Sequence, residues 1–252
     1  MTRRLFAALD IYHDVAPHSA AMNMAIDEAL LEQTTVASIR FYRWHVPALS
    51  FGYFGEFNEV AIYERDRDLV RRWTGGGIVF HGDDLTYSIV IPASDSVFAE
   101  SSMTIYEKIH RALADALGAG GRRAELASLA ALCDRQNSRK GDLQIAQRRT
   151  GDRRFLESAI MDRSYNCFAN PVRADVMLNG RKIAGAAQRR TRRGLLQQGS
   201  IQGVDLENDL GEGFAHVLSL SRSKRKISEE ILDRARELAQ QKYDADCWLR
   251  MR

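Results

Sequence analysis

The sequence has 252 residues, of which 45% are hydrophobic and 27% charged, with a formal net charge of +3. This balance is typical of a soluble globular enzyme, and no apolar run approaches the roughly 18 residues that a membrane helix needs. Asp10 interrupts the apolar start before a signal-peptide core can form, so we expect a cytoplasmic protein with no membrane partner. The three scattered cysteines and the lack of an HExxH motif exclude a disulfide framework and predict no metal site.

The first half of the chain predicts a series of strands and helices. The stretch SAAMNMAIDEALLEQ predicts a helix with Ser19 as its N-cap, because Met22, Ala25, Ile26 and Ala29 fall on one face. A second helix is expected at 103–120, a short helix at 58–69, and strands at 4–12, 37–44, 48–54, 70–73, 78–80 and 85–92. Because only HVP separates the strands 37–44 and 48–54, we expect them to pair as a hairpin or to lie as near neighbours.

The second half predicts a long loop, a hairpin and a helical tail. Residues from about 120 to 165 carry many charges with little periodicity, which indicates a loop. Asn179-Gly180 between two strand-like runs indicates a type I′ hairpin, and a further strand is expected at 195–201. An amphipathic helix is expected at 227–243. The fold class expected is α+β, with a mostly antiparallel sheet flanked by helices and a helical C-terminal tail.

The positive charges gather in two runs, RRTRR at Arg189–Arg193 and SRSKRK at Ser221–Lys226. Either run alone indicates a solvated face, whereas the two together could also attract an acidic protein or a nucleic acid. Neither run contains an aromatic residue that could stack on bases, so we expect no nucleic-acid partner.

The stretch RRWTGGGIVFH raises the possibility of a ligand site. No GxxxxGK[ST] motif is present, and the glycines precede a strand rather than a helix, which excludes a P-loop and a dinucleotide fingerprint. Ordering three consecutive glycines costs conformational entropy, and a plain turn seldom needs all three of them. We therefore favour a ligand site over a purely structural turn. Arg71 and Arg72 alternate across a strand, and only one of them can face the same pocket.

A second group of candidate residues lies in the stretch CFANP…NGRKIAG. Strand alternation places Lys182 on the same face as Ala184 and opposite Arg181 and Ile183. The small residues after Lys182 leave space for a substrate beside its amine, although composition alone favours an ordinary exposed lysine. Taken alone, Cys167 is more often a small buried hydrophobic residue than a nucleophile.

Two motifs, RRWTGGGIVFHGDDLTYSI and GRKIAGAAQRR…LLQQGSI, resemble the biotin/lipoate protein ligase superfamily. The stretches MNMAIDEALL, IRFYRWHVPALSFGYF and KYDADCW are similar to its lipoate branch, so only about 120–165 is left unmatched. Members of this superfamily attach lipoate, octanoate or biotin to a lysine of a carrier domain. The resemblance implies a catalytic domain of this type at 1–205, with 206–252 as a helical C-terminal extension packed on it.

The resemblance also implies a site. In the family the glycine turn and the lysine strand line one pocket for the acyl chain. Carried over to this sequence, the catalytic residues are Cys167 and Lys182. The implied substrate-binding residues are Arg71, Arg72, Thr74, Gly75, Gly76, Gly77, His81, Gly180, Ala184, Gly185, Gln188 and Gly199.

The resemblance leaves three possible functions, two that correspond to catalytic branches of the family and one that is non-catalytic. NCFANP is similar to the cysteine motif of octanoyltransferases, which need no cofactor and move octanoyl from acyl carrier protein to lipoyl domains or glycine-cleavage H-type carrier proteins. GGGIVFH looks more like the ligases, which use ATP and magnesium, and Gln198 stands where a histidine is common. The residues after QQGSI are too few for a second domain, so a ligase of this length would need a partner chain.

The leading expectation is a cysteine-dependent octanoyltransferase. The alternatives are an ATP-dependent lipoate–protein ligase and a non-catalytic acyl-binding or carrier-docking protein. Both carriers that the resemblance implies are acidic proteins, which would give the basic runs a purpose.

Overall fold

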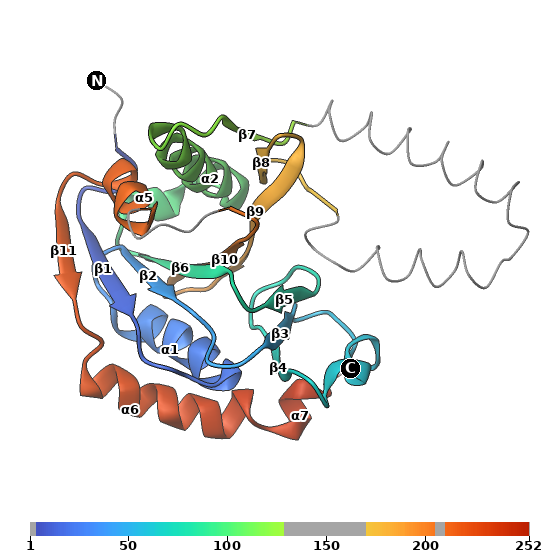
Figure 1. Cartoon of the computed structure of the whole chain (residues 1–252). Coiled ribbons are helices and arrows are strands. Elements are labelled where there is room, and N and C mark those ends of the chain that lie inside the picture. Colours follow the sequence, from blue (N-terminus) through green and yellow to red (C-terminus); the bar gives the residue numbers. More distant parts are fainter. Residues whose placement is uncertain (1–3, 129–169, 205–209, 252) are drawn as a thin grey trace, which may run out of the picture.

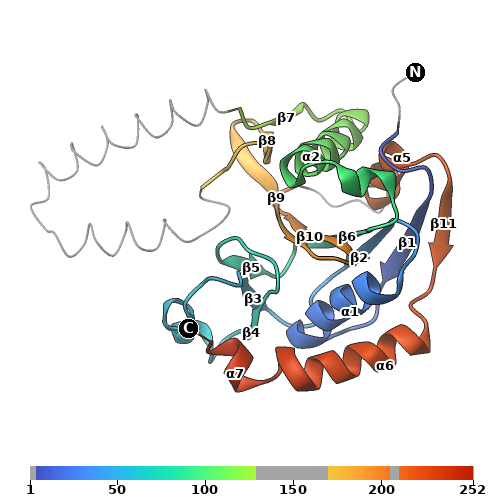
Figure 2. The same cartoon turned by 180° about the vertical axis from the view of Figure 1, so that it is seen from behind.

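The computed structural model describes residues 4–128, 170–204 and 210–251, which form an α+β fold (Figure 1). A large sheet has helices on both faces, and a small sheet lies at its side (Figures 1 and 2). Helices α1 (Ala20–Gln33) and α6 (Glu229–Leu238) cover one face, and α2 (Ser102–Ala119) and α5 (Leu210–Leu218) cover the other. The predicted fold class is confirmed.

Within the described residues, the large sheet has eight strands in the order β11-β1-β2-β6-β10-β9-β8-β7. Strand β1 runs parallel to β11 and β2, and the other five neighbouring pairs are antiparallel, as expected for a mostly antiparallel sheet. The bounds are β1 Leu9–Asp14, β2 Ser38–Tyr42, β6 Leu85–Pro92, β7 Ala124–Leu126, β8 Val176–Leu178, β9 Arg181–Arg190, β10 Gly194–Ile201 and β11 Arg222–Arg225.

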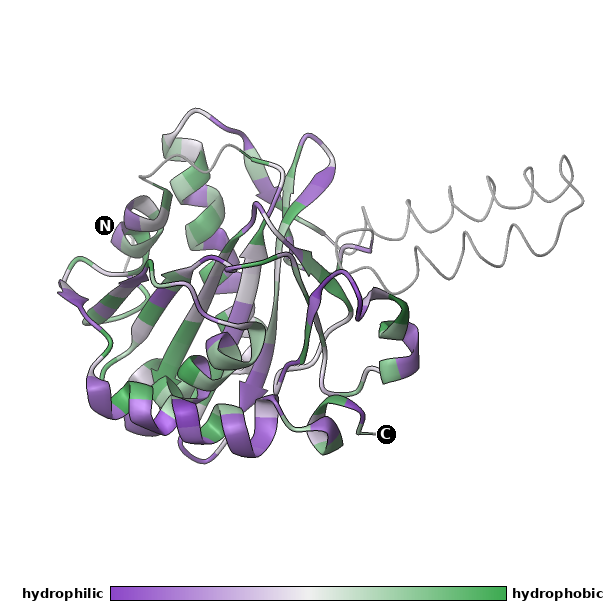
Figure 3. Cartoon of the chain, turned by 60° about the horizontal axis from the view of Figure 1, so that its bottom comes forward, coloured by the Kyte–Doolittle hydropathy of each residue, from purple (hydrophilic) through white to green (hydrophobic). Residues whose placement is uncertain are grey.

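Two hydrophobic cores lie on opposite faces of this sheet. On β2, Ile39 and Phe41 pack into the core beneath α2 and α5, whereas Tyr42 packs into the core beneath α1 and α6. Because helices cover both faces, the central strands β2, β6 and β10 are buried along nearly their whole length, polar residues included. Figure 3 shows the same division, with hydrophobic residues on the strands between the helical layers and hydrophilic residues on the outward turns of the helices.

The small sheet has the order β4-β3-β5, with β3 (Ala48–Phe51) between β4 (Asp68–Arg71) and β5 (Val79–His81). The prediction that the strands at 37–44 and 48–54 pair was wrong. Strand β2 already has β1 on one side and β6 on the other, so it has no edge for β3. The chain therefore leaves the large sheet after β2 and starts the small one.

The predicted hairpin at Asn179-Gly180 is confirmed and joins β8 to β9. Both turn residues have positive φ angles, 50° and 73°, as a type I′ turn requires. The pairing is irregular just after the turn, because Met177 faces Lys182 and Val176 faces Ala184. Residue Ile183 is thus an extra residue on β9, and this bulge breaks the simple alternation of side chains around Lys182.

Three local predictions need correction. The helix expected at 58–69 is two short 3₁₀ turns, Phe57–Glu59 and Ala61–Tyr63, followed by β4. Strand β7 falls inside the loop expected at about 120–165, and the rest of that loop from 129 onward lies outside the described residues. Strand β11 was not predicted, because all four of its side chains are exposed and leave no alternating pattern.

The C-terminal part of the described chain packs on α1. Helix α6 continues as a π-helical turn, η4 (Ala239–Tyr243), and then α7 (Asp246–Leu249). Ser19 caps α1 by accepting a hydrogen bond from the Met22 N–H, as predicted. Ion pairs of Arg234 with Glu32 (2.7 Å) and of Lys242 with Glu28 (2.6 Å) join the two layers. The boundary expected at residue 205 stays a prediction.

Candidate functional site

A cavity of about 50 Å³ lies between the two sheets, beside Met24 in the first half of α1. Residues from β2, β3, β5, β6, β9 and β10 line it, together with Trp44 after β2 and the segment before β5. Among the predicted catalytic and substrate-binding residues, those that line it are Arg72, Gly76, His81, Lys182, Gly185 and Gly199. The structure therefore brings the glycine turn (Thr74–Gly77) and the lysine strand β9 to one cavity.

The two consecutive arginines face opposite ways, as strand alternation requires. Arg72 lines the cavity and donates to Ser50 Oγ (2.6 Å) and to the carbonyl oxygens of Gly75 (3.1 Å) and Gly77 (2.8 Å). Arg71 instead donates to backbone carbonyls on the other side, those of Tyr53, Gly55, Trp248, Leu249 and Met251. The inclusion of Arg71 among the pocket residues was therefore wrong.

The glycine turn depends on glycine at one position above all. Gly76 has φ = 86°, a backbone conformation that residues with a Cβ rarely adopt. Its carbonyl oxygen would lie 2.0 Å from a Cβ on Gly52, so the turn packs directly on the backbone after β3. A Cβ on Gly75 would meet no atom within 4 Å, so packing does not require glycine there. The space beside Gly75 is consistent with a turn that leaves room for a ligand.

His81 is buried in the cavity wall and held on three sides. Its Nδ1 bonds Asp84 (2.8 Å), its Nε2 bonds Ser50 (2.7 Å), and its ring stacks on Trp44 with centroids 4.0 Å apart. Burial lowers the pKa of His81, and the neighbouring Asp84 opposes this only in part. Burial alone would raise the pKa of Asp84, but hydrogen bonds from His81, the Gly82 N–H and Ser200 outweigh it and lower that pKa.

These shifts fix a neutral imidazole beside an ionised carboxylate. The carboxylate of Asp84 can only accept, so His81 donates from Nδ1 and accepts the Ser50 hydroxyl at Nε2. Sequence reasoning found His81 but missed Ser50, whose contribution depends on the pairing of β3 with β5. It also missed Asp84, although this residue lies only three positions after His81.

Lys182 is almost fully buried and forms an ion pair with Asp175 (2.8 Å). Tyr106 donates to the same carboxylate (2.6 Å), and burial raises the pKa of this phenol, so the hydroxyl stays protonated. Gly185 lies against the lysine, since a Cβ there would be 2.6 Å from Nζ. The bulge at Ile183 places Gly185 beside Lys182, whereas Ala184 lies in the hydrophobic core, contrary to the face expected for it.

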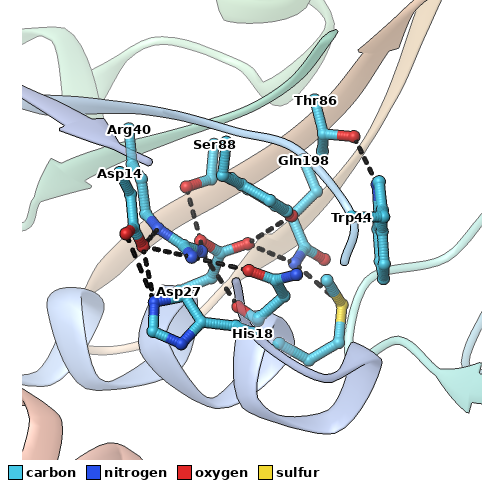
Figure 4. Close-up of polar contacts among 11 residues, drawn as sticks. Asp14, His18, Asp27, Arg40, Trp44, Thr86, Ser88 and Gln198 are labelled. Carbon is cyan, nitrogen blue, oxygen red and sulfur yellow. Dashed lines mark hydrogen bonds and ion pairs between the residues drawn. The ribbon is translucent and has the colours of Figure 1, made fainter. Parts of the chain in front are cut away.

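A chain of buried hydrogen bonds ties the glycine turn to helix α1, and Figure 4 shows its part around Gln198, Asp27, Arg40 and Ser88. Thr74 Oγ1 donates to Gln198 Oε1 (2.8 Å), and Gln198 Nε2 donates to Asp27 Oδ2 (2.7 Å). Asp27 also accepts from Arg40 Nη1 (2.9 Å) and from Ser88 Oγ (2.7 Å). Thr74 is thus a buried support of the turn and does not line the cavity, whereas Gln198 does.

Sequence reasoning missed this network, although a signal for it was present. Helix α1 is buried around most of its circumference, yet it carries the polar residues Asn23, Asp27 and Glu28. A buried carboxylate is costly unless it is paired, so acidic residues within such an apolar helix indicate partners elsewhere in the fold. Arg40, which is fully buried in β2, is that partner for Asp27 and also bonds Asp14.

Of the remaining predicted residues, Gly180 and Gln188 do not line the cavity, Gly199 does, and Cys167 lies outside the described chain. Gly180 forms the hairpin turn, and Gln188 donates to Gln197 on the neighbouring strand. Gly199 lines the cavity, and a Cβ there would lie 2.3 Å from the Tyr87 ring, so glycine leaves space for that ring. Cys167 lies outside the described residues.

In the part of the chain that the structure describes, no group of three or more His, Cys, Asp or Glu side chains is placed to hold a metal ion. No helix within the same residues is long and apolar enough to cross a membrane.

Relatives of known name resemble this chain over most of its length. Octanoyltransferase LipM of Bacillus cereus is 35% identical over 202 residues, which is 77% of this chain but only 64% of the relative's own length. Octanoyltransferase LipM of Bacillus subtilis is 30% identical over 282 aligned positions, covering 91% of this chain and 94% of the relative.

Solved structures share the fold. A crystal structure of lipoate-protein ligase A bound with ATP has a TM-score of 0.70 at 20% identity, covering 96% of this chain and 98% of that one. A bi-partite lipoate protein ligase of Thermoplasma acidophilum, described with its E2 lipoyl domain, has a TM-score of 0.64 at 19% identity, with 97% and 96% covered. The family profile described as "Lipoyl protein ligase A/B catalytic domain" matches residues 19–243, and the chain belongs to this family.

Proposed function

We propose that this protein is an octanoyltransferase, which moves an octanoyl group from acyl carrier protein to a lysine of a lipoyl domain through a thioester on Cys167. The main support for this proposal is the similarity to octanoyltransferases LipM; the alignment with one of them covers 94% of that protein's length. The buried Lys182–Asp175 pair at the cavity supports it, because acyl transfer between a thiol and an amine needs a group that moves protons.

In the first half-reaction, the Cys167 thiolate attacks the thioester carbon of octanoyl acyl carrier protein. The positive charge of Lys182 favours the thiolate over the thiol. The bond between the acyl carbon and the carrier sulfur breaks, and the departing thiolate takes a proton from the Lys182 ammonium. Asp175, at 2.8 Å, holds Nζ in place while its charge changes.

In the second half-reaction, the neutral lysine amine of the lipoyl domain attacks the acyl carbon on Cys167. The carbon–sulfur bond of the acyl-enzyme breaks, and Cys167 leaves as the thiolate. The proton of the attacking amine passes to Lys182, which returns to the ammonium form. Both carrier proteins are substrates in this scheme, and no cofactor takes part.

The acyl chain would occupy the cavity between the sheets. At about 50 Å³ the cavity holds only a few water molecules, so an eight-carbon chain enters as side chains move aside. Met24 lines the cavity and is suited to such movement, because its unbranched side chain adapts to irregular spaces. Burial at about 0.8 kcal/mol per methylene would contribute several kcal/mol and favour a chain of this length.

The decisive experiment is intact-mass analysis after mixing the protein with octanoyl acyl carrier protein in the absence of ATP. We expect a mass gain of one octanoyl group, which a lipoyl domain then removes. Cys167→Ala should show neither the adduct nor transfer. Cys247→Ala is the matched control, because Cys247 is an exposed free cysteine in α7, and it should behave as the unsubstituted protein does.

Other results would contradict the proposal in different ways. An ATP requirement with full activity of Cys167→Ala would identify an ATP-dependent ligase instead. Retained binding of the acyl carrier protein without any transfer would identify a non-catalytic docking protein.

A further inference from the structure

Residues 71–74 form a short wall with the cavity on one side and the C-terminal helices on the other. Arg72 lines the cavity, and Thr74 bonds the cavity residue Gln198. The side chains of Arg71 and Trp73 point the opposite way, toward α7 and η4. This is the alternation of an extended chain, and it makes one stretch of backbone part of two different packing layers.

Arg71 joins two segments that are distant in the sequence. Its guanidinium donates to the carbonyls of Tyr53 (2.9 Å) and Gly55 (2.6 Å) after β3, and to those of Trp248 (2.8 Å), Leu249 (3.0 Å) and Met251 (2.6 Å). The indole Nε1 of Trp248 returns a hydrogen bond to the Arg71 carbonyl (3.0 Å). The segment Asp246–Met251 is therefore bound to the side chain and to the backbone of the same residue.

Trp73 is held in a similar way by two cations. The Nζ of Lys242 lies 4.3 Å from the Trp73 ring and 4.5 Å from the Trp248 ring, and it pairs with Glu28 of α1 (2.6 Å). Arg189 of the lysine strand β9 lies 5.1 Å from the Trp73 ring. These cation–aromatic contacts help to hold residues 71–74 in place on the side that faces away from the cavity.

We propose that the segment Asp246–Met251 positions the glycine turn of the acyl pocket, with Arg71 and Trp248 as the positioning residues. Arg71 and Arg72 share one peptide bond. The hydrogen bonds between Arg71 and the segment Asp246–Met251 therefore also fix the backbone from which Arg72 reaches the carbonyls of Gly75 and Gly77. Loss of these hydrogen bonds leaves the C-terminal end of β4 free to shift, and the glycine turn shifts with it. The inference rests on the proposed function only in taking this cavity as the acyl site.

The first test uses Arg71→Lys, which keeps the positive charge but loses the planar fork that bonds both segments. We expect the KM for octanoyl acyl carrier protein to rise about tenfold while kcat stays within about twofold, since the pocket binds less well but its chemistry is intact. Trp248→Phe, which keeps a ring and loses the donor to Arg71, should shift KM in the same direction by less.

Arg250→Ala is the matched control in the same segment. Arg250 pairs with Glu64 and Asp246 at the surface and makes none of the contacts with Arg71, so its KM should not change. Equal KM values for Arg250→Ala and Arg71→Lys would overturn the inference, because the effect would then come from the segment's general stability.

The second test is amide hydrogen exchange of the ligand-free protein. In Arg71→Lys the amides of Gly75–Val79 should exchange faster, while those of β1 and β2 stay unchanged. An unchanged turn, or equal acceleration throughout the large sheet, would overturn the inference. This measurement involves neither Cys167 nor transfer, so it remains valid if the proposed function fails.

Discussion

Substitution of Gly185 by alanine tests the geometry around Lys182 with a single added methyl group. Gly185 has an ordinary backbone conformation, so alanine introduces no backbone strain. Its Cβ would lie 2.5 Å from Cε and 2.6 Å from Nζ of Lys182, and 3.1 Å from Oδ1 of Asp175. The nearest atoms belong to the end of a flexible side chain, so we expect the protein to fold and the ammonium to move.

The size of this movement can be worked out from the contact distances. Ordinary contact with a Cβ begins at 3.4 Å, so Nζ must retreat by about 0.8 Å or more from its present 2.6 Å. A displacement of about 1 Å from the productive geometry can lower a rate about 100-fold. The 2.8 Å bond to Asp175 would also lengthen beyond hydrogen-bond range if the retreat is directed away from that carboxylate.

The assay is the initial rate of octanoyl transfer from acyl carrier protein to a lipoyl domain, followed by mass spectrometry, with thermal unfolding measured in parallel. We expect kcat/KM to fall about 100-fold, or about 2.7 kcal/mol, with unfolding changed by only a few degrees. Gly118→Ala in α2 is the control, since its Cβ meets nothing within 4 Å and so touches neither Lys182 nor Asp175. A Gly185→Ala protein with full activity would refute the assigned role of Lys182.

Other described contacts give three further predictions. Gly76→Val should fold but lose acyl binding, because a branched side chain disfavours φ = 86°, and a calorimetric titration that still detects octanoyl binding would contradict this. Replacing Arg190, Arg192 and Arg193 by serine should lower the association rate of acidic carriers and weaken its salt dependence, with small-thioester turnover unchanged; equal loss for both substrates would point to folding. Burial lowers the pKa of His110 to about 4, below its unfolded value, so the unfolded state gains protons first as pH falls. The unfolding free energy should therefore drop by about 2 kcal/mol between pH 7 and pH 5, and urea denaturation of His110→Gln should show a smaller drop.

Local sequence signals predicted the elements whose cause is local. The Ser19 cap, the Asn179-Gly180 turn and the strand at 85–92 all formed as expected, because a cap, a positive φ pair and a buried apolar run need no distant partner to be recognised. Strand β11 lacked any such signal, since its pairing with β1 leaves four exposed side chains.

The site was predictable only as far as its motifs go. The glycine turn and Lys182 meet at one cavity, but the partners that fix them come from other elements: Asp175 for the lysine and Gln198 for Thr74. Strand alternation correctly predicted that the side chains of Arg71 and Arg72 point to opposite sides. Which of the two faces the cavity depends on where the C-terminal helices pack. The bulge at Ile183 likewise depends on the register of β8, which the sequence of β9 alone does not determine.

The basic strand β11 has a consequence for how this protein behaves in concentrated solution. Among the described residues, no strand pairs with its outer edge, and such an edge can pair with a strand of another molecule. Its row of arginine and lysine side chains discourages this pairing. In the sheet order β11 stands five strands from β9, a span of about 24 Å, so its charges lie far from Lys182. Substitutions at Arg222–Arg225 should therefore act first on self-association, and measured losses of activity there need a light-scattering control before they are attributed to carrier binding.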